Sequence, residues 1–525
     1  MNERPENIVG APDAVRLPTM PEEVAIARPP RPVGVDWKRL AAIALGIVLF
    51  TLVYMSPPWP DAIDPQGQAF PLTWQGKAAL GLFLLAATWW VFEVIPIGVT
   101  SITIAVVQAL FLIRPDRVMA DGQVISGTWI AFTDFLAPSV WFIIGSIVFG
   151  LTFSQTGLAK RMAYKMLQMV GERTSMILLG SFMMTTLLTH IMAHTAVAAA
   201  MYPLLMAIYA LYAGSGETPT KFGKNLFIGM AYVAGAGSIC TLLGAARGAV
   251  GIGFYKEIVG RDIGFFEYTK FLAPVGWVMA IVLWGFMMVI LKPERRSIPG
   301  LKERAQALYS RLGPMTRTEK LTLVIVAFSI VIMSAKNYIP FLEPVNKSAV
   351  ILTATVLFFL FKILTIQDLE EVPWNIILLF GGAMSIGYCL WQTGAAEWLA
   401  VQWLVLFKDA HWFVFVMAIS LFVLIMTNLI MNVAAIAISL PVALVLAPYL
   451  GVAPEVIFFS SLAVAGMPFL LLVGAAPNAI AYESKQFLSS EFFLWGVPAS
   501  VLLMLVLAVF VMFIWPLMGM PVTLN

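Results

Sequence analysis

The sequence predicts an all-α protein that crosses a membrane many times. Three observations predict this fold: an apolar composition, a succession of long apolar runs, and an internal duplication. The 525 residues are 60% hydrophobic and only 12% charged, with a mean hydropathy of +0.89. A water-soluble protein of this length could not cover so much apolar surface. We therefore expect a polytopic membrane protein.

The duplication places the same landmarks in the same order in both halves of the chain. Each landmark of the first half returns 230 to 238 residues later (244 to 474, and 193 to 431). The paired landmarks are Gln155-Thr156-Gly157 with Gln392-Thr393-Gly394, Ala193-His194-Thr195 with Met431-Asn432-Val433, Pro203 with Pro441, and 244–248 with 474–478. Helix-breaking residues at matched positions of two repeats are typical of transporters, whose substrate site lies where the broken helices meet.

The apolar runs give the order of the elements, each long enough with its flanks to span a bilayer. A leading span is expected near 39–55. The first half then contains spans near 76–94, 97–113, 138–157, 225–255 and 270–292, with an interrupted stretch at 174–212. The second half contains spans near 319–338, 347–366, 374–394, 455–485 and 493–516, with an interrupted stretch at 411–450.

Lysine and arginine predict the orientation, because basic loops remain in the cytoplasm. Basic residues cluster before the first span, after the fourth, and in the connection 293–318, whereas the loop 56–75 has no Lys or Arg. These clusters fall on one side only if the stretches 174–212 and 411–450 each enter and leave by the same face. We therefore predict about eleven transmembrane helices plus two re-entrant hairpins, with the N-terminus cytoplasmic and the C-terminus outside.

Five crossings and one hairpin in each half make the two repeats inverted in topology. The hairpins then open to opposite sides, and their tips should meet near the midplane. The expected organisation is a disordered cytoplasmic tail at 1–38, a leading helix and external loop at 39–75, a first repeat at 76–292 with its hairpin at 174–212, a basic cytoplasmic linker at 293–318, a second repeat at 319–516 with its hairpin at 411–450, and an external tail at 517–525.

Four interruptions are expected at membrane depth: the tips near 193–195 and 431–433, and the breaks near 244–248 and 474–478. Such backbone is tolerated only where protein or a water-filled cavity surrounds it. Helix N-termini at a break suit the oxygens of an anion, and exposed carbonyls suit a cation such as Na⁺. The pattern therefore indicates a site for an anion and a cation, without choosing the substrate.

Three segments carry a resemblance to a known family. They are Trp89-Trp90-Val91-Phe92-Glu93-Val94-Ile95-Pro96, then Leu379-Phe380-Gly381-Gly382 followed by Gln392-Thr393-Gly394, and Gly474-Ala475-Ala476-Pro477-Asn478-Ala479-Ile480. In order and spacing they resemble the divalent anion:sodium symporters over roughly 76–515. This resemblance implies a homodimeric carrier whose mobile domain carries both hairpin tips across the membrane, an elevator movement.

The resemblance also implies the site residues. Substrate binding is expected at His194, Thr195, Arg247, Asn432, Val433, Ala476 and Pro477, and a Na⁺ site near the second tip at Asn432, Ala475 and Asn478. The family's tips read Ser-Asn-Thr, but only Thr195 and Asn432 keep that pattern here. The family's first break reads Thr-Pro-Pro-Asn, but here it reads Ala245-Ala246-Arg247-Gly248. The first tip has therefore lost oxygen ligands.

Arg247 and His194 are the charged or chargeable groups at the first tip and break. Arg247 either replaces a bound cation, grips an anion through two hydrogen bonds, or bonds helix-end carbonyls as a structural residue. His194 either carries a coupling proton or is a neutral substitute for asparagine.

We expect a secondary transporter, not an enzyme, for small di- or multivalent organic anions such as dicarboxylates, coupled to Na⁺ at one retained site or to H⁺. The alternatives are a permease or exchanger for inorganic anions or sulfonates that does not use Na⁺, and an intramembrane enzyme. No organic cofactor and no nucleic-acid partner are expected. The expected partners are the anion, membrane lipid and a second copy of the chain, in a bacterial inner membrane.

Overall fold

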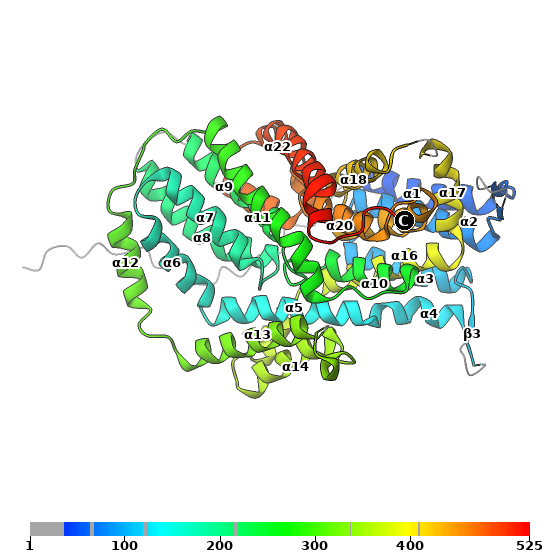
Figure 1. The fold of residues 1–525 in the computed structure, drawn as a ribbon, viewed down its shortest axis with the longest axis horizontal. Helices are drawn as coiled ribbons and strands as arrows, with labels where there is room; N and C mark the ends of the chain where they lie inside the picture. Colours follow the sequence, from blue (N-terminus) through cyan, green and yellow to red (C-terminus); the bar gives the residue numbers. More distant parts are fainter. Residues whose placement is uncertain are drawn as a thin grey trace, which may run out of the picture.

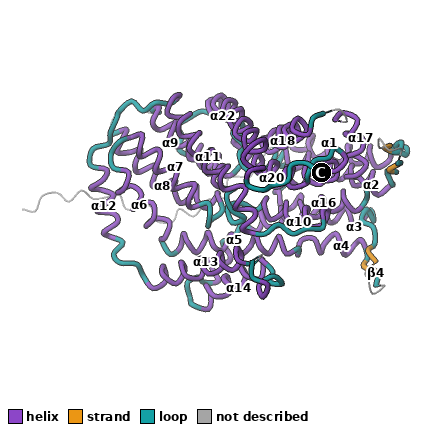
Figure 2. Tube along the Cα trace, viewed as in Figure 1, coloured by secondary structure: helices purple, strands orange, loops and turns teal. Residues whose placement is uncertain are grey.

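The computed structural model describes residues 36–63, 68–118, 123–214, 219–336, 338–407 and 410–524, with the backbone alone at 403–407. These residues are almost wholly helical (Figures 1 and 2). The described strands form two short antiparallel pairs, β1 (Ala62–Ile63) with β2 (Ala69–Phe70) and β3 (Arg117–Val118) with β4 (Val124–Ile125). Most of the predicted tail lies outside the described residues.

The helices of the first half follow the predicted order, with four additions. They are α1 (Trp37–Met55), α2 (Trp74–Val91), α3 (Ile97–Leu110), α4 (Gly127–Thr133), η1 (Asp134–Leu136), α5 (Pro138–Gln155), α6 (Leu158–Val170), α7 (Thr174–Leu188), α8 (His194–Ala213), α9 (Lys221–Gly237), α10 (Arg247–Val259), α11 (Phe265–Ile290) and α12 (Leu301–Arg311). The predicted boundary of the tail at residue 38 is late, because Asp36 caps α1 by accepting from the Arg39 N–H.

The helices of the second half correspond to those of the first in order. They are α13 (Arg317–Ala335), η2 (Pro340–Leu342), α14 (Lys347–Leu360), α15 (Ile366–Glu370), α16 (Trp374–Gln392), α17 (Ala395–Phe407), α18 (Trp412–Leu429), α19 (Asn432–Tyr449), α20 (Pro454–Ala465), η3 (Leu472–Gly474), α21 (Ala476–Tyr482), α22 (Ser489–Val509), η4 (Phe510–Ile514) and α23 (Trp515–Leu517).

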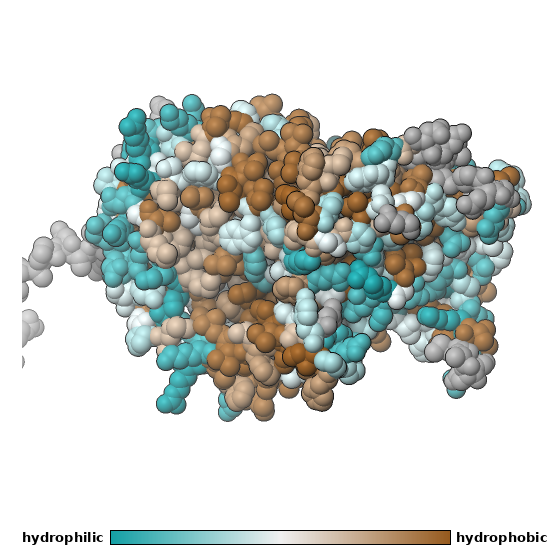
Figure 3. Space-filling model, in the orientation of Figure 1, coloured by the Kyte–Doolittle hydropathy of each residue, from teal (hydrophilic) through white to brown (hydrophobic). Residues whose placement is uncertain are grey.

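The protein is an integral membrane protein. Among the described residues, nine helices are long and apolar enough to cross a bilayer, and four shorter apolar helices accompany them. In Figure 3 the apolar surface covers the middle of the molecule, and hydrophilic surface lies at the end where α12 is found. The hairpin arms α8, α18 and α19 are among the nine, because length and composition alone do not separate an arm from a crossing helix. The number of eleven crossings therefore stays a prediction.

At each copy of the Gln-Thr-Gly landmark, a long apolar helix ends and a second helix begins. Gly157 has φ 78° at the start of α6, and Gly394 has φ 75° just before α17. This left-handed backbone favours glycine, and no atom beyond the adjacent residues lies within 4 Å of a Cβ placed at either position. Backbone conformation, not lack of space, therefore explains these glycines. The helices α6 and α17 that follow were not predicted.

Both ends of the first hairpin, α7 and α8, are held by the same loop. The N–H of Thr174 donates to the carbonyl of Arg296 (3.0 Å), and its hydroxyl donates to the carbonyl of Arg295 (2.9 Å). At the other end the N–H of Arg295 donates to the hydroxyl of Tyr212 (2.8 Å). The two ends of this hairpin therefore lie beside one loop, as a re-entrant hairpin requires.

The loop after α11 also caps the next helix. Glu294 accepts from the hydroxyl of Tyr212 (2.8 Å) and from the N–H groups of Lys221 (2.5 Å) and Phe222 (3.3 Å) at the start of α9. Partial burial raises the pKa of the Glu294 carboxyl, but the hydrogen bonds lower it more, led by that from the N–H of Lys221. The pKa therefore lies below its ordinary value, and the charged carboxylate is the form that fastens the hairpin to α9.

The second hairpin, α18 and α19, ends against different loops. The ring of Tyr449 packs on Phe70, with 6.4 Å between centroids, and the N–H of Leu524 donates to the carbonyl of Gly451 (2.8 Å). The loop after α1 and the C-terminal segment thus meet the end of this hairpin. The two hairpins are rooted at separate parts of the chain, which is the arrangement that inverted repeats require.

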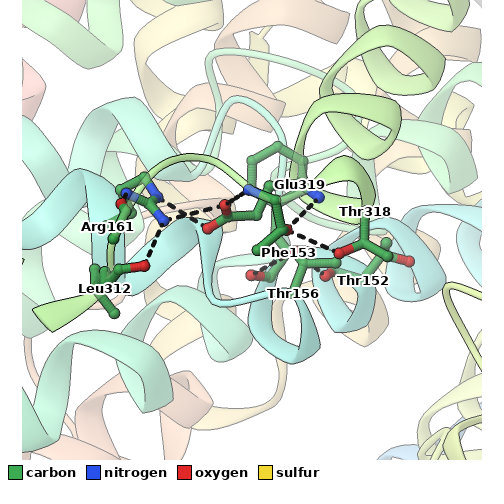
Figure 4. Close-up of polar contacts among 9 residues, drawn as sticks. Thr152, Phe153, Thr156, Arg161, Leu312, Thr318 and Glu319 are labelled. Atoms are coloured by element: carbon green, nitrogen blue, oxygen red, sulfur yellow. Dashed lines mark hydrogen bonds and ion pairs between the residues drawn. The ribbon is translucent and has the colours of Figure 1, made fainter.

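A buried ion pair joins α6 to the start of α13 (Figure 4). The guanidinium of Arg161 donates from Nε to Oε1 of Glu319 (2.9 Å) and from Nη2 to Oε2 (3.1 Å). Its Nη1 donates to the carbonyl of Gly313 (2.9 Å), and Glu319 also accepts from the N–H of Thr316 (2.7 Å). The two side chains are only 9% and 5% exposed. The linker between the halves is therefore locked to α6 by a two-pronged contact.

We predict that Glu319→Ala destabilises the protein, because it leaves the Arg161 guanidinium buried without its carboxylate. The expected loss is about 3–5 kcal/mol, measured by unfolding in detergent. The control is Arg117→Ala, which removes a 3.8 Å contact with Glu257 between side chains that are 59% and 35% exposed and should cost at most about 1 kcal/mol. Equal losses in the two variants would contradict this account.

Candidate functional site

The four predicted interruptions meet around one cavity of about 330 Å³. It is lined by Ala193–Ala196 and Ala199 of the first tip, Met431–Val433 of the second, Ala245 and Ala246 of the first break, and Gly474–Ala476 of the second. Its remaining wall comes from α5, the turn before α16, and α16 itself. Ser154 and Glu371 mark its edge at the end of α5 and before α16.

Four helices begin at this cavity. The residues that precede α8, α19, α10 and α21 are Ala193, Met431, Ala246 and Ala475, and none of them caps its helix with a side chain. All four line the cavity. The N-terminus of a helix presents backbone N–H groups and the positive end of its dipole. The arrangement therefore makes the cavity favourable for a negatively charged group.

The first tip is bonded to the first break. The N–H of His194 donates to the carbonyl of Gly244 (2.9 Å), and the hydroxyl of Thr241 donates to the carbonyl of His190 (2.8 Å). A Cβ at Gly244 would lie 2.7 Å from the carbonyl oxygen of Thr189. The close approach of the two segments thus requires glycine at 244, which is the residue that opens the repeated landmark.

His190 has a structural role just outside the cavity. The indole N–H of Trp277 donates to Nε2 of His190 (3.2 Å), so this nitrogen carries no proton. Nδ1 then donates to the carbonyl of Thr186 (2.8 Å), and the ring is neutral. His190 holds the tip against α11.

The second tip is bonded to the second break by residues that the sequence did not single out. The hydroxyl of Thr427 donates to the carbonyl of Ala465 (2.9 Å), and Oδ1 of Asn428 accepts from the N–H of Leu470 (2.7 Å). Both side chains lie in the last turn of α18. Both residues could have been identified from their position one turn before a predicted tip. Polar side chains there must form hydrogen bonds with the backbone groups that the neighbouring break leaves unpaired.

Six of the nine predicted site residues line the cavity: His194, Thr195, Asn432, Val433, Ala475 and Ala476. Pro477, Asn478 and Arg247 do not. Nδ2 of Asn478 donates to the carbonyls of Pro468 (2.9 Å) and Leu471 (3.1 Å), so its side chain braces the second break from behind. Only its Oδ1 is left to bind a cation.

Arg247 lies behind the first break and is fully buried. Its Nη2 donates to the hydroxyl of Ser238 (2.8 Å), whereas Nε and Nη1 have no partner among the described residues. A Cβ at Gly466, where the second break begins, would lie 2.5 Å from Nη2. In this conformation the guanidinium does not reach the cavity, and its charge acts on the cavity from behind.

The two tips offer different groups to a cation. Near the second tip, the amide of Asn432 and the backbone around Ala475 supply oxygen, the ligand that hard cations prefer. Near the first tip stand Ala193 and His194, with a buried guanidinium behind them. The donor set therefore fits Na⁺ at the second tip and does not fit a cation at the first. Among the described residues, no cluster of His, Cys, Asp or Glu could hold a transition metal.

Comparison with known proteins identifies the family. A family profile described as the sodium:sulfate symporter transmembrane region matches residues 37–521. The chain belongs to this family. It is the group of divalent anion:sodium symporters that the sequence motifs indicate, so the protein is a secondary transporter and not an enzyme.

Curated relatives cover nearly the whole chain. A sodium-dependent dicarboxylate transporter, SdcS, of Staphylococcus saprophyticus is 25% identical over 507 residues, which cover 92% of this chain and 93% of the relative. SdcS of Staphylococcus aureus strain NCTC 8325 is 24% identical over 494 residues, which cover 89% and 90%.

A solved structure shares the fold. The structure of Neisseria gonorrhoeae MtrF, from a class of antimetabolite efflux pumps, aligns with a TM-score of 0.53 and covers 82% of this chain and 96% of its own. At 14% sequence identity this similarity concerns the fold alone.

Proposed function

We propose that this protein carries small dicarboxylates across a bacterial inner membrane, coupled to Na⁺ bound near the second tip. The observation that carries the proposal is the convergence of four uncapped helix N-termini on one cavity. A volume of about 330 Å³ lies within the range of about 300–1,000 Å³ that small-molecule sites occupy. The named relatives are sodium-dependent dicarboxylate transporters, which favours this anion class.

In the proposed mechanism, His194, Thr195, Asn432 and Val433 hold the anion from the two tips, and the N–H groups near Ala476 bind its oxygens. Pro477, the second residue of the short helix α21, has a fixed φ, so it helps to set the direction of these donors. Bound Na⁺, with Asn432, Ala475 and Asn478 as its ligands, would add positive charge at the second tip.

Arg247 takes the place of a cation at the first tip in this proposal. Its guanidinium is buried without a carboxylate partner among the described residues. Such a charge raises the potential of the cavity beside it, because the surrounding interior screens charge poorly. His194 then acts as a neutral hydrogen-bonding residue, since a second positive charge beside Arg247 would be repelled.

We further propose an elevator movement. Close contacts bind each tip to its break, at Gly244 and at Gly474, where a Cβ would lie 3.0 Å from the Thr427 carbonyl. One body would therefore move against α5, α14 and α16. It would consist of the two hairpins together with α9–α10 and α20–α21. By resemblance to the family we propose a homodimer in lipid. The basic linker supports a cytoplasmic N-terminus, with the C-terminus outside.

The direct test is uptake into proteoliposomes of succinate, citrate, sulfate and taurine, with Na⁺ present, absent, or replaced by a pH gradient. We expect succinate uptake that requires Na⁺. Asn432→Ala should reduce it by about 10- to 100-fold, because a hydrogen bond to a charged group is worth about 1.5–3 kcal/mol. Preference for sulfate or taurine without Na⁺ would instead favour an inorganic-anion or sulfonate permease.

A matched pair of threonine variants controls for unspecific damage. Thr195→Val alters the lining of the cavity, whereas Thr353→Val changes an exposed position of α14 whose hydroxyl bonds only its own helix. Thr195→Val should slow uptake and Thr353→Val should leave it unchanged. Equal behaviour would argue against a substrate role for the tip.

A separate prediction concerns Arg247. Because its charge would stand in for one bound cation, uptake by the wild type should depend on Na⁺ with a Hill coefficient of about 1. Arg247→Ala should abolish uptake or make it depend more steeply on Na⁺, while Arg247→Lys keeps part of it. The control Ser238→Ala removes only the hydrogen bond that Arg247 donates. It should therefore change uptake less than Arg247→Ala does. Unchanged uptake in Arg247→Ala would refute the assigned role.

A further inference from the structure

A second cavity, of about 380 Å³, shares two walls with the first. The helices α5 and α16 line both cavities at successive levels. Pro138, Ser139, Phe142 and Tyr388 line the second cavity, whereas residues 143–154 of α5 and Phe380 face the first. Leu242, in the turn of the first break, also reaches the second cavity. We call this cavity the basic crevice; it approaches the same break from the side opposite Ser154 and Glu371.

The basic crevice takes its name from three lysines on three different elements. Lys256 comes from α10, Lys336 from the end of α13, and Lys347 from the start of α14. The charges of Lys256 and Lys336 repel that of Lys347. Three ammonium groups brought together from separate parts of the chain are costly unless an anion can approach them.

Two carboxylates also line the crevice, and each has its own cationic partner. Asp262 accepts from Nζ of Lys347 (2.9 Å), and Glu257 lies 3.8 Å from Arg117. Lys336 donates to a carbonyl, that of Val345 (2.8 Å). Among the described residues, neither Lys256 nor Lys336 forms an ion pair with a carboxylate, so two positive charges remain uncompensated.

The position of the crevice adds to this charge. The first turn of α5, an 18-residue helix without a side-chain cap at Ala137, lines the wall and directs its positive dipole end inward. In Figure 3 a hydrophilic patch interrupts the apolar surface near the position of α10 in Figure 1. An anion in solution can therefore reach the lysines without crossing apolar surface.

We propose that the basic crevice is a docking site for small carboxylate anions on the face opposite the mouth of the first cavity. The proposal rests on the proposed function, because the docked anion is the transported one. A positive funnel raises the local concentration of an anion and its association rate, by about 10- to 1,000-fold in favourable cases. Movement of α10 with the first break would then open a path from the lysines to the tips.

The test compares the two directions of transport. Succinate uptake is measured in whole cells and in inverted membrane vesicles for Lys256→Gln, Lys336→Gln and the double variant. In the double variant we expect the KM for transport from the crevice side to rise about tenfold. The maximal rate and the KM for transport from the other side should not change. Added salt should weaken wild-type uptake from that side more than uptake by the double variant. The reason is that dissolved ions screen the attraction between the lysines and the anion.

The control is Lys302→Gln, an exposed lysine of α12 on the linker, which should not change KM on the crevice side. Thermal unfolding of each variant checks that the fold is intact. Equal changes on both sides, or no change on either, overturn the docking site while leaving the transport function standing. A wild type that moves neither succinate nor another anion of the panel overturns the proposed function and the docking site together.

Discussion

The whole arrangement depends on one constraint: backbone that leaves the helix inside a membrane must find its hydrogen-bond partners within the protein. Each hairpin tip here meets a broken helix of its own repeat. The N–H of His194 is satisfied by Gly244 at the first tip, and Asn428 satisfies Leu470 at the second. Each tip must therefore lie beside its own break, and the two pairs meet where Gly466 packs against Arg247. The cavity is the space left between them.

The same constraint explains why the cavity suits an anion. At the start of a helix the first N–H groups have no partner within the helix. Four helices start at the cavity without a side chain to cap them. Groups that would be costly if left unsatisfied become binding groups once an anion accepts their hydrogen bonds. We propose that the N–H groups not already bonded within the protein bind the anion.

The two repeats differ in how they could supply positive charge beside the cavity. Near the second tip the chain offers the amide oxygens of Asn432 and Asn478 and the backbone around Ala475. Near the first it holds Arg247, whose guanidinium packs against Gly466 of the other repeat. One fixed charge and one site for a mobile cation would together balance a divalent anion. This asymmetry is what distinguishes the chain from a symmetric duplication.

Much of this could be predicted from the sequence, since helix-breaking residues and apolar runs act locally. The tips, the breaks and the approximate spans follow from them. The directions of side chains do not: Arg247 and Asn478 lie in the predicted breaks, but tertiary packing points them away from the cavity. The helices α6 and α17 were missed because each has only 13 residues, too few to cross a bilayer. The basic crevice joins lysines from distant elements that only the fold brings together.

Thiol protection tests most directly whether both repeats build one anion site. Cysteines are introduced singly at Ala196 and Ala476, since the native Cys240 and Cys389 are buried, and their labelling is followed as succinate is added. We expect succinate to slow labelling at both positions with the same half-maximal concentration. Protection of one position alone, or two different concentrations, would contradict a shared site.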